Sequence, residues 1–404
     1  MERFISFAGL FVMMGIAWLL SDNKKKMDFR VIIGGVALQF ILALIIMKTS
    51  MGQVFFIWSK NVVTTVIEMS DAGAEFLFGP SFKDHFFAFK VLPTIIFASS
   101  LSYTLFYLGI LQKIIGAMAL VMKKVMNISG AESLVTAANV FIGQTEAPLF
   151  VKPYLRTMTQ SEIMVMMTGG MATVAGGVLA AYVGFGISAG HLLAASIMSA
   201  PAAIVLAKIL YPEQEISPTY GTVSVIPKME EVNIFDAACK GASEGLKLAL
   251  NVGAMLIAFI SLVKLINVGL GELGQVIGVT LSLELILGYL FRPLAFCMGI
   301  SWEESQIVGQ MLGTKVVVNE FLSYIQLGEY ISGDKVGQLS ERAITITTYA
   351  LCGFANFSSI AIQVGGIGEL EPQRKKDFAR HGFKAMIGGT LAAFMTACIA
   401  GVLI

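Results

Sequence analysis

Apolar residues run along this 404-residue chain in long blocks, and the charged residues are concentrated between the blocks. Eight blocks are each close to the roughly 20 residues that an α-helix needs to cross a bilayer. They cover about residues 4–21, 30–47, 86–108, 160–184, 190–209, 240–267, 340–363 and 380–403. An outer-membrane barrel would instead need short strands that alternate apolar and polar residues. The pattern therefore predicts an all-α polytopic membrane protein with about eight transmembrane helices.

Two further apolar segments are interrupted midway by polar residues. A helix that starts at Glu132 would be only about 16 Å long, half the hydrocarbon thickness, when Gly143 and Pro148 interrupt it. Residues 146–154 can return the same way, which predicts a re-entrant hairpin with the string Gly-Gln-Thr-Glu-Ala-Pro at its tip. A single kinked span fits the length equally well, but it would place Glu146 in the middle of a crossing.

The segment 302–327 has a similar pattern, with a carboxylate at Glu320 and a glycine at Gly313, where we expect its tip. Each predicted hairpin precedes a helix that Gly pairs or an Asn/Ser cluster interrupt midway, at residues 168–179 and 349–362. Irregular backbone inside a membrane is tolerated only where it lines a cavity or ligand site. Two opposed hairpins, each followed by a broken helix, predict the inverted repeat that is typical of secondary transporters.

The distribution of Lys and Arg predicts the orientation of the chain. Basic residues are clustered at 24–30, 123–156 and 374–380. If all three clusters are cytoplasmic, as the positive-inside rule indicates, eight full spans leave both termini outside. Residues 51–79 mix charged and aromatic side chains and predict an amphipathic helix in the membrane interface. Residues 211–233 form the one sizeable polar loop.

Composition and charge narrow the function classes. The chain is 56% hydrophobic and 14% charged, whereas soluble domains carry about a quarter charged residues. Its net charge of +1 gives no basis for a nucleic-acid partner. The sequence contains no nucleophile elbow, HExxH motif or phosphate loop, which disfavours an enzyme. A channel would line its pore with a ring of one repeated residue type, but the two halves carry different polar sets.

Glu146 and Glu320 are the strongest chemical signal, because an unpaired carboxylate at mid-bilayer is costly and usually functional. Lys315 could neutralise one of them, which would make that carboxylate structural instead. Neutral amides and hydroxyls accompany the two carboxylates: Gln144, Thr145, Asn319, Asn356, Ser358 and Ser359. This set suits a neutral polyhydroxylated or heterocyclic solute. Phe354 could stack on a planar ring, or it could serve packing alone.

A cation site is a separate hypothesis. Asn139 lies four residues before the predicted tip, and Thr173 lies at the break of the following helix. Their oxygens, together with carbonyls freed by unwound turns, would supply the oxygen ligands that a hard monovalent cation prefers. Asn and Thr inside membrane helices also hydrogen-bond neighbouring helices. These two residues alone leave both interpretations open.

Three strings carry a family resemblance: GQTEAPL (143–149), VVNEF (317–321) and GFANFSSI (353–360). In this order and spacing they resemble the concentrative nucleoside transporter family, and its sodium-coupled bacterial members most closely. The resemblance covers the whole chain. It implies a symporter for nucleosides such as uridine, with sodium as the coupling ion and no other cofactor.

The resemblance also implies an architecture. It describes a homotrimer in a bacterial inner membrane, in which a scaffold domain makes the trimer contacts and a transport domain slides across the bilayer like an elevator. The domains expected from it are 1–110, mainly scaffold; 111–209, transport; 210–270, a loop and a scaffold span; and 271–404, transport.

The same resemblance assigns the site residues. The first hairpin is expected to hold the nucleobase, and the second hairpin with its broken helix to hold the ribose. Residues implied for the nucleobase are Gln144, Thr145, Glu146 and Val178, and those for the ribose are Glu320, Phe354, Asn356 and Ser359. Sodium is expected at the side chains of Asn139 and Thr173 and the carbonyls of Ile142 and Val174. The alternative is a proton-coupled carrier that uses Glu146 or Glu320 as its proton site.

Overall fold

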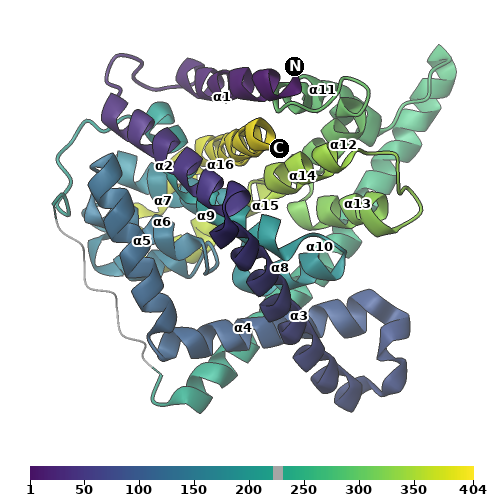
Figure 1. The fold of residues 1–404 in the computed structure, drawn as a ribbon, viewed down its shortest axis with the longest axis horizontal. Helices are drawn as coiled ribbons and strands as arrows, with labels where there is room; N and C mark the ends of the chain where they lie inside the picture. Colours follow the sequence, from purple (N-terminus) through teal and green to yellow (C-terminus); the bar gives the residue numbers. More distant parts are fainter. Residues whose placement is uncertain (222–230) are drawn as a thin grey trace.

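The computed structural model describes residues 1–221 and 231–404, except for the side chains at positions 84–86 and 277. Within these residues the chain forms helices joined by short irregular segments, and it forms no strand. The N- and C-termini lie side by side in the bundle (Figure 1). The Arg3 guanidinium donates a hydrogen bond to the carbonyl oxygen of Ile404 at 3.2 Å. Both ends of the chain therefore lie on the same face.

Five α-helices precede the first hairpin. They are α1 (Glu2–Leu19), α2 (Phe29–Lys48), α3 (Ser50–Phe78), α4 (Leu92–Tyr107) and α5 (Ile110–Met126), with a 3-10 and a π turn, η1 (Pro80–His85) and η2 (Phe86–Val91), before α4. The Thr49 hydroxyl accepts from Gly52 N–H where α3 begins, and Gly79, with φ of 79°, ends it. The helix predicted over 51–79 is therefore continuous.

The first hairpin forms as predicted. Helix α6 (Gly130–Asn139) runs inward and a 3-10 segment, η3 (Ala147–Tyr154), returns beside it. A reciprocal capping box of Ser129 and Glu132 fixes the start of α6. The chain reverses over residues 140–146, so the string Gly-Gln-Thr-Glu occupies the turn.

Both broken helices are also confirmed. The first consists of α7 (Gln160–Ala172) and α8 (Gly176–Gly184), and the second of α14 (Glu341–Leu351) and α15 (Phe357–Leu370). The two breaks touch, because Phe354 N–H donates to the carbonyl oxygen of Thr173 at 3.3 Å. Gly353 has φ of 133°, and a Cβ there would lie 2.8 Å from the carbonyl oxygen of Met171. Glycine therefore permits this close crossing.

The second hairpin exists, but its predicted tip at Gly313 is wrong. Helix α12 (Ser305–Val317) runs straight through Gly313, and the chain turns at residues 318–319 before α13 (Glu320–Ser332). The glycine serves helix packing instead, because a Cβ at Gly313 would clash with the side chain of Leu287 on the preceding helix. A glycine that permits close helix contact has the same local signature as one that permits a turn.

The remaining helices are α9 (Ala189–Leu210), α10 (Ile234–Ile277), α11 (Leu283–Cys297) and α16 (Lys375–Leu403), the last preceded by a 3-10 turn, η4 (Pro372–Arg374). Helices α7, α9 and α16 form the buried centre, whereas α1, α2 and α10 expose much of their apolar surface. The long helix α10 packs along α4 at the side of the bundle (Figure 1). Of the predicted polar loop 211–233, residues 222–230 lie outside the described residues.

Seven segments of the described chain are long and apolar enough to cross a membrane, one fewer than the eight predicted. The difference is the segment 340–363. Its break divides it between α14 and α15, which have 11 and 14 residues. Neither half alone reaches the roughly 20 residues that a span requires.

Candidate functional site

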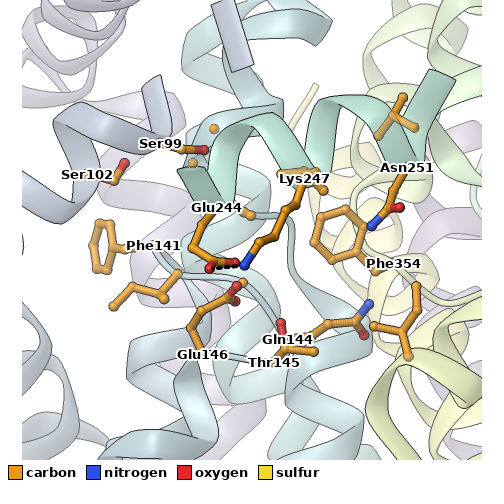
Figure 2. Close-up of a pocket in the computed structure, with 18 of the residues that line it drawn as sticks. Ser99, Ser102, Phe141, Gln144, Thr145, Glu146, Glu244, Lys247, Asn251 and Phe354 are labelled. Atoms are coloured by element: carbon orange, nitrogen blue, oxygen red, sulfur yellow. Dashed lines mark hydrogen bonds and ion pairs between the residues drawn. The ribbon is translucent and has the colours of Figure 1, made fainter. Parts of the chain in front are cut away.

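A cavity of about 660 Å³ lies between the two hairpin tips and the helices α4 and α10 (Figure 2). Seven of the eight residues expected to bind substrate line it: Gln144, Thr145, Glu146, Glu320, Phe354, Asn356 and Ser359. The eighth, Val178, is buried in α8 and is not part of the cavity wall. The topology thus brings together residues that are more than 200 positions apart in the sequence.

Gln144 connects the first hairpin to the second broken helix. Its side-chain amide donates to the hydroxyl of Ser359 at 3.2 Å. Its carbonyl oxygen accepts from the amide of Gln363 at 3.0 Å, and Gln363 also donates to the backbone carbonyl of Met167 at 3.1 Å. Gln144 is buried, and this chain of bonds fixes its position.

The Glu320 carboxylate is buried and held from two sides. One oxygen accepts from the Tyr182 hydroxyl at 3.0 Å, and the other accepts from the side-chain amide of Asn356 at 3.2 Å. The Asn356 carbonyl oxygen in turn caps α15 by accepting from Ser359 N–H at 2.9 Å. Capping orients the amide toward Glu320, so local helix chemistry places the partner of the carboxylate.

Glu146 is placed differently from Glu320. Its Oε2 atom is buried and has no hydrogen-bond partner in the described residues. The carboxylate folds back over the turn, and a Cβ at Gly143 would clash with it. Glu146 also lines the cavity, next to Gln144 and Thr145.

The residues expected at the sodium site lie where the first hairpin meets the first break. Both polar atoms of the Asn139 amide are buried and have no partner in the described residues. Thr173 caps the end of α7, and its hydroxyl donates to the Gly169 carbonyl at 3.0 Å. The carbonyls of Ile142 and Val174 belong to the irregular backbone beside them, outside the helices. This donor set is all oxygen and fits a sodium ion.

Helix α10 supplies part of the cavity wall that we did not predict. Its residues Glu244, Lys247 and Asn251 line the cavity, and Figure 2 shows Glu244 and Lys247 pointing toward Glu146. The Lys247 ammonium pairs with the Glu244 carboxylate at 2.7 Å. Their spacing of three and seven residues puts them on one helix face. These three polar residues on one face of an otherwise apolar span are the sequence pattern from which a role for α10 in the cavity wall could have been predicted.

Three family models match consecutive parts of the chain. The models described as the N-terminus and the C-terminus of the Na⁺-dependent nucleoside transporter match residues 8–81 and 191–401. A model described as "Gate: Nucleoside recognition" matches residues 88–189, which include the first hairpin and broken helix.

Curated relatives and solved structures match over the full chain. Rat solute carrier family 28 member 3 is 43% identical over all of this chain and 59% of its own length, so the chain spans about three fifths of that relative. An uncharacterized transporter of Haemophilus influenzae is 44% identical over 99% of this chain and 97% of its own. The structure of CNTnw in an inward-facing substrate-bound state matches with TM-score 0.93 and 40% identity, covering 100% and 98% of the two chains. An outward-facing variant of CNTnw matches with TM-score 0.93 and 39% identity, with the same coverage.

Proposed function

Since this chain belongs to the family of Na⁺-dependent nucleoside transporters, we propose that it is a symporter that moves a nucleoside into the cell together with sodium. The resemblance first inferred from three sequence strings is confirmed by that membership, and the family is one of transporters rather than enzymes. The observation that carries the proposal is the cavity at which both hairpin tips meet, with the carboxylates of Glu146 and Glu320 on its wall.

The ribose is recognised by the second hairpin and its broken helix. An ionised carboxylate offers about four acceptor positions. Tyr182 and Asn356 occupy two of those on Glu320, which leaves acceptors for vicinal hydroxyls of a ribose. Ser359 lies one turn from Asn356 and offers a further hydroxyl.

The nucleobase is recognised by the tip of the first hairpin. The Glu146 Oε2 atom, which has no hydrogen-bond partner among the described residues, accepts from an N–H group of the base. Gln144 offers both a donor and an acceptor. Phe354 lies on the same cavity and provides an apolar face for the ring. Thr145 completes this side of the site.

Sodium would be held by the side chains of Asn139 and Thr173 and the carbonyls of Ile142 and Val174. The ion supplies the positive charge that these four oxygens attract, and it braces the turn before the hairpin tip. The contact between Phe354 N–H and the Thr173 carbonyl joins this region to the nucleoside residues. Ordering one site therefore lowers the cost of ordering the other, which is positive coupling.

In the proposed mechanism the transport domain slides across the bilayer like an elevator, so that the nucleoside site opens to one side of the membrane and then to the other. The protein is a homotrimer of a bacterial inner membrane, with both termini outside. Helix α4 and the part of α10 up to residue 270 belong to the scaffold, and the hairpins with their broken helices move past them. The domain limits proposed are 1–110 and 210–270 for scaffold and connecting loop, and 111–209 and 271–404 for transport. Inward-facing and outward-facing structures of CNTnw, at closely similar TM-scores, support such a pair of states.

Uptake of labelled uridine into proteoliposomes tests this function. We expect an inward sodium gradient to drive uptake at constant pH, because the proposed ion site is an all-oxygen cage without a titrating ligand. A pH gradient alone, without sodium, should drive none. Uptake driven only by the pH gradient would contradict sodium coupling and favour a proton carrier, in which the carboxylate of Glu146 or Glu320 takes the proton.

A further inference from the structure

Lys315 is a fully buried lysine that the proposed mechanism does not use. Its side chain is 0% exposed, and its ammonium donates to the backbone carbonyl of Ala350 at 2.8 Å. It also lies 5.9 Å from the ring centroid of the buried Phe394. A buried ammonium is costly unless its surroundings compensate it. The burial of this ammonium therefore requires a structural or functional explanation.

The acceptor of Lys315 is the end of a broken helix. Ala350 is the last residue but one of α14, so its carbonyl is one of the four that a helix leaves without an internal partner. Carbonyls at a helix C-terminus carry partial negative charge and attract cations. Among the described contacts Lys315 forms no ion pair with Glu320, and its hydrogen bond is with the backbone instead.

The inverted repeat gives this arrangement a counterpart in the first half. There, Asn139 ends the inward helix of the hairpin and faces the last turn of α7, where a Cβ on Gly169 would lie 3.5 Å from the Asn139 amide. In the second half, Lys315 lies in the last turn of the inward helix α12 and reaches the last turn of α14. Thr173 follows Asn139 by 34 residues, and Cys352, which caps α14, follows Lys315 by 37.

We propose that the Lys315 ammonium is a tethered cation, which occupies in the second half the place that corresponds to the sodium site of the first. This inference rests on the proposed function. In the first half the Asn139 amide has no partner among the described residues, whereas in the second half the chain supplies its own positive charge. In this proposal a cation lies at the C-terminal end of both α7 and α14, the first parts of the two broken helices.

Two consequences follow for binding. The second break is ordered without an ion, so Asn356 and Ser359, at the start of α15, stand in position before the nucleoside arrives. Sodium is then required only in the first half, and each chain binds one sodium ion. Lys315 is a positioning residue for the nucleoside site rather than a group that touches the substrate.

The variant Lys315→Met tests the charge while it keeps a long, flexible apolar side chain. We expect uridine affinity at saturating sodium to fall about tenfold or more, because loss of the charged hydrogen bond to the Ala350 carbonyl leaves the second break to be ordered on binding. The rise in melting temperature caused by sodium alone should persist, because the ion site lies in the other half. Leu312→Ala is the matched control, since Leu312 is also fully buried on α12. It should lower the melting temperature while uridine affinity stays within about twofold of wild type.

The outcomes separate the inference from the proposed function. If wild-type uridine binding is independent of sodium, the proposed function fails and the inference fails with it. If wild type depends on sodium but Lys315→Met binds uridine as wild type does, only the inference fails. Loss of affinity in both variants, in proportion to their melting temperatures, would also overturn it. Should Lys315→Met not fold, equilibrium binding of labelled sodium to the wild type decides: one ion per chain supports the tethered cation, and two overturn it.

Discussion

Glu320 combines burial with an incomplete set of partners among the described residues, and this combination supports the sugar-binding role proposed for it. It is 4% exposed, and two donors, Tyr182 and Asn356, hold its two oxygens. The donors fix the plane of the carboxylate, and Glu320 lines the cavity. A carboxylate that is oriented before binding loses little freedom when a ligand arrives.

Replacing Glu320 by Gln should therefore weaken nucleoside binding with little change of shape. The substitution turns one acceptor oxygen into a donor and removes the charge, so we expect the dissociation constant for uridine to rise about tenfold or more. Calorimetric titration of the detergent-solubilised protein measures it. Glu329→Gln on the same helix is the control, because Glu329 is exposed and pairs with Lys335. Equal uridine affinity in the Glu320 and Glu329 variants would refute the ribose assignment.

The Asn139 amide, which has no hydrogen-bond partner in the part of the chain that the structure describes, leads to a second prediction about one side chain. The substitution Asn139→Leu removes an oxygen ligand from the proposed ion site, so we expect uridine binding to lose its dependence on sodium. A sodium titration of uridine affinity checks this. Ser133→Ala is the control on the same helix, since the Ser133 hydroxyl bonds only locally, to the Gly130 carbonyl, among the described contacts. If uridine affinity in Asn139→Leu depends on sodium concentration as it does in the wild type, Asn139 is not a ligand of the proposed ion site.

At the scale of elements, helix α10 contributes more to the site than its apolar sequence suggests. Lys247 and Glu244 form an ion pair on the cavity wall opposite Glu146 (Figure 2). Lys247 is well exposed, so the pair itself adds little stability. Its value lies in balancing charge: without the ammonium, two carboxylates would face each other across the cavity.

Neutralising Lys247 should consequently affect substrate binding rather than folding. For Lys247→Met we expect the KM for uridine uptake to rise about two- to tenfold, with the maximal rate changed less, because the pair is partly screened by solvent. Initial uptake rates over a range of uridine concentrations separate the two quantities. Lys264→Met lies on the same helix away from the cavity and should behave as wild type. An unchanged KM in the Lys247 variant would remove α10 from the binding site.

Local patterns in the sequence predicted the elements but not every contact between them. Both hairpins and both broken helices follow from interruptions in apolar blocks, because a membrane tolerates irregular backbone only at special places. The turn at 318–319 was missed, since Gly313 permits close packing on Leu287 rather than a reversal of the chain. Tyr182 and Gln363 were missed because each lies within an apolar helix, and only tertiary contacts make their partners visible.

At the scale of the whole molecule, the two halves meet at their irregular points. The breaks of the two broken helices cross at Gly353, where the absence of a side chain lets Phe354 N–H reach the Thr173 carbonyl. This crossing joins the region proposed for sodium to the region proposed for the nucleoside without a ligand-to-ligand contact. The repeat was readable in the sequence, whereas the crossing of its two halves required the fold.

The neighbouring termini have a consequence for how such a chain can be extended. The Arg3 guanidinium donates a hydrogen bond to the carbonyl of Ile404, so the two ends of the chain lie next to each other. A segment appended at either end would emerge at the same place on the bundle and would not have to pass around it. Longer relatives, of which this chain spans about three fifths, could therefore carry extra segments at one end or both without disturbing the helices that enclose the cavity.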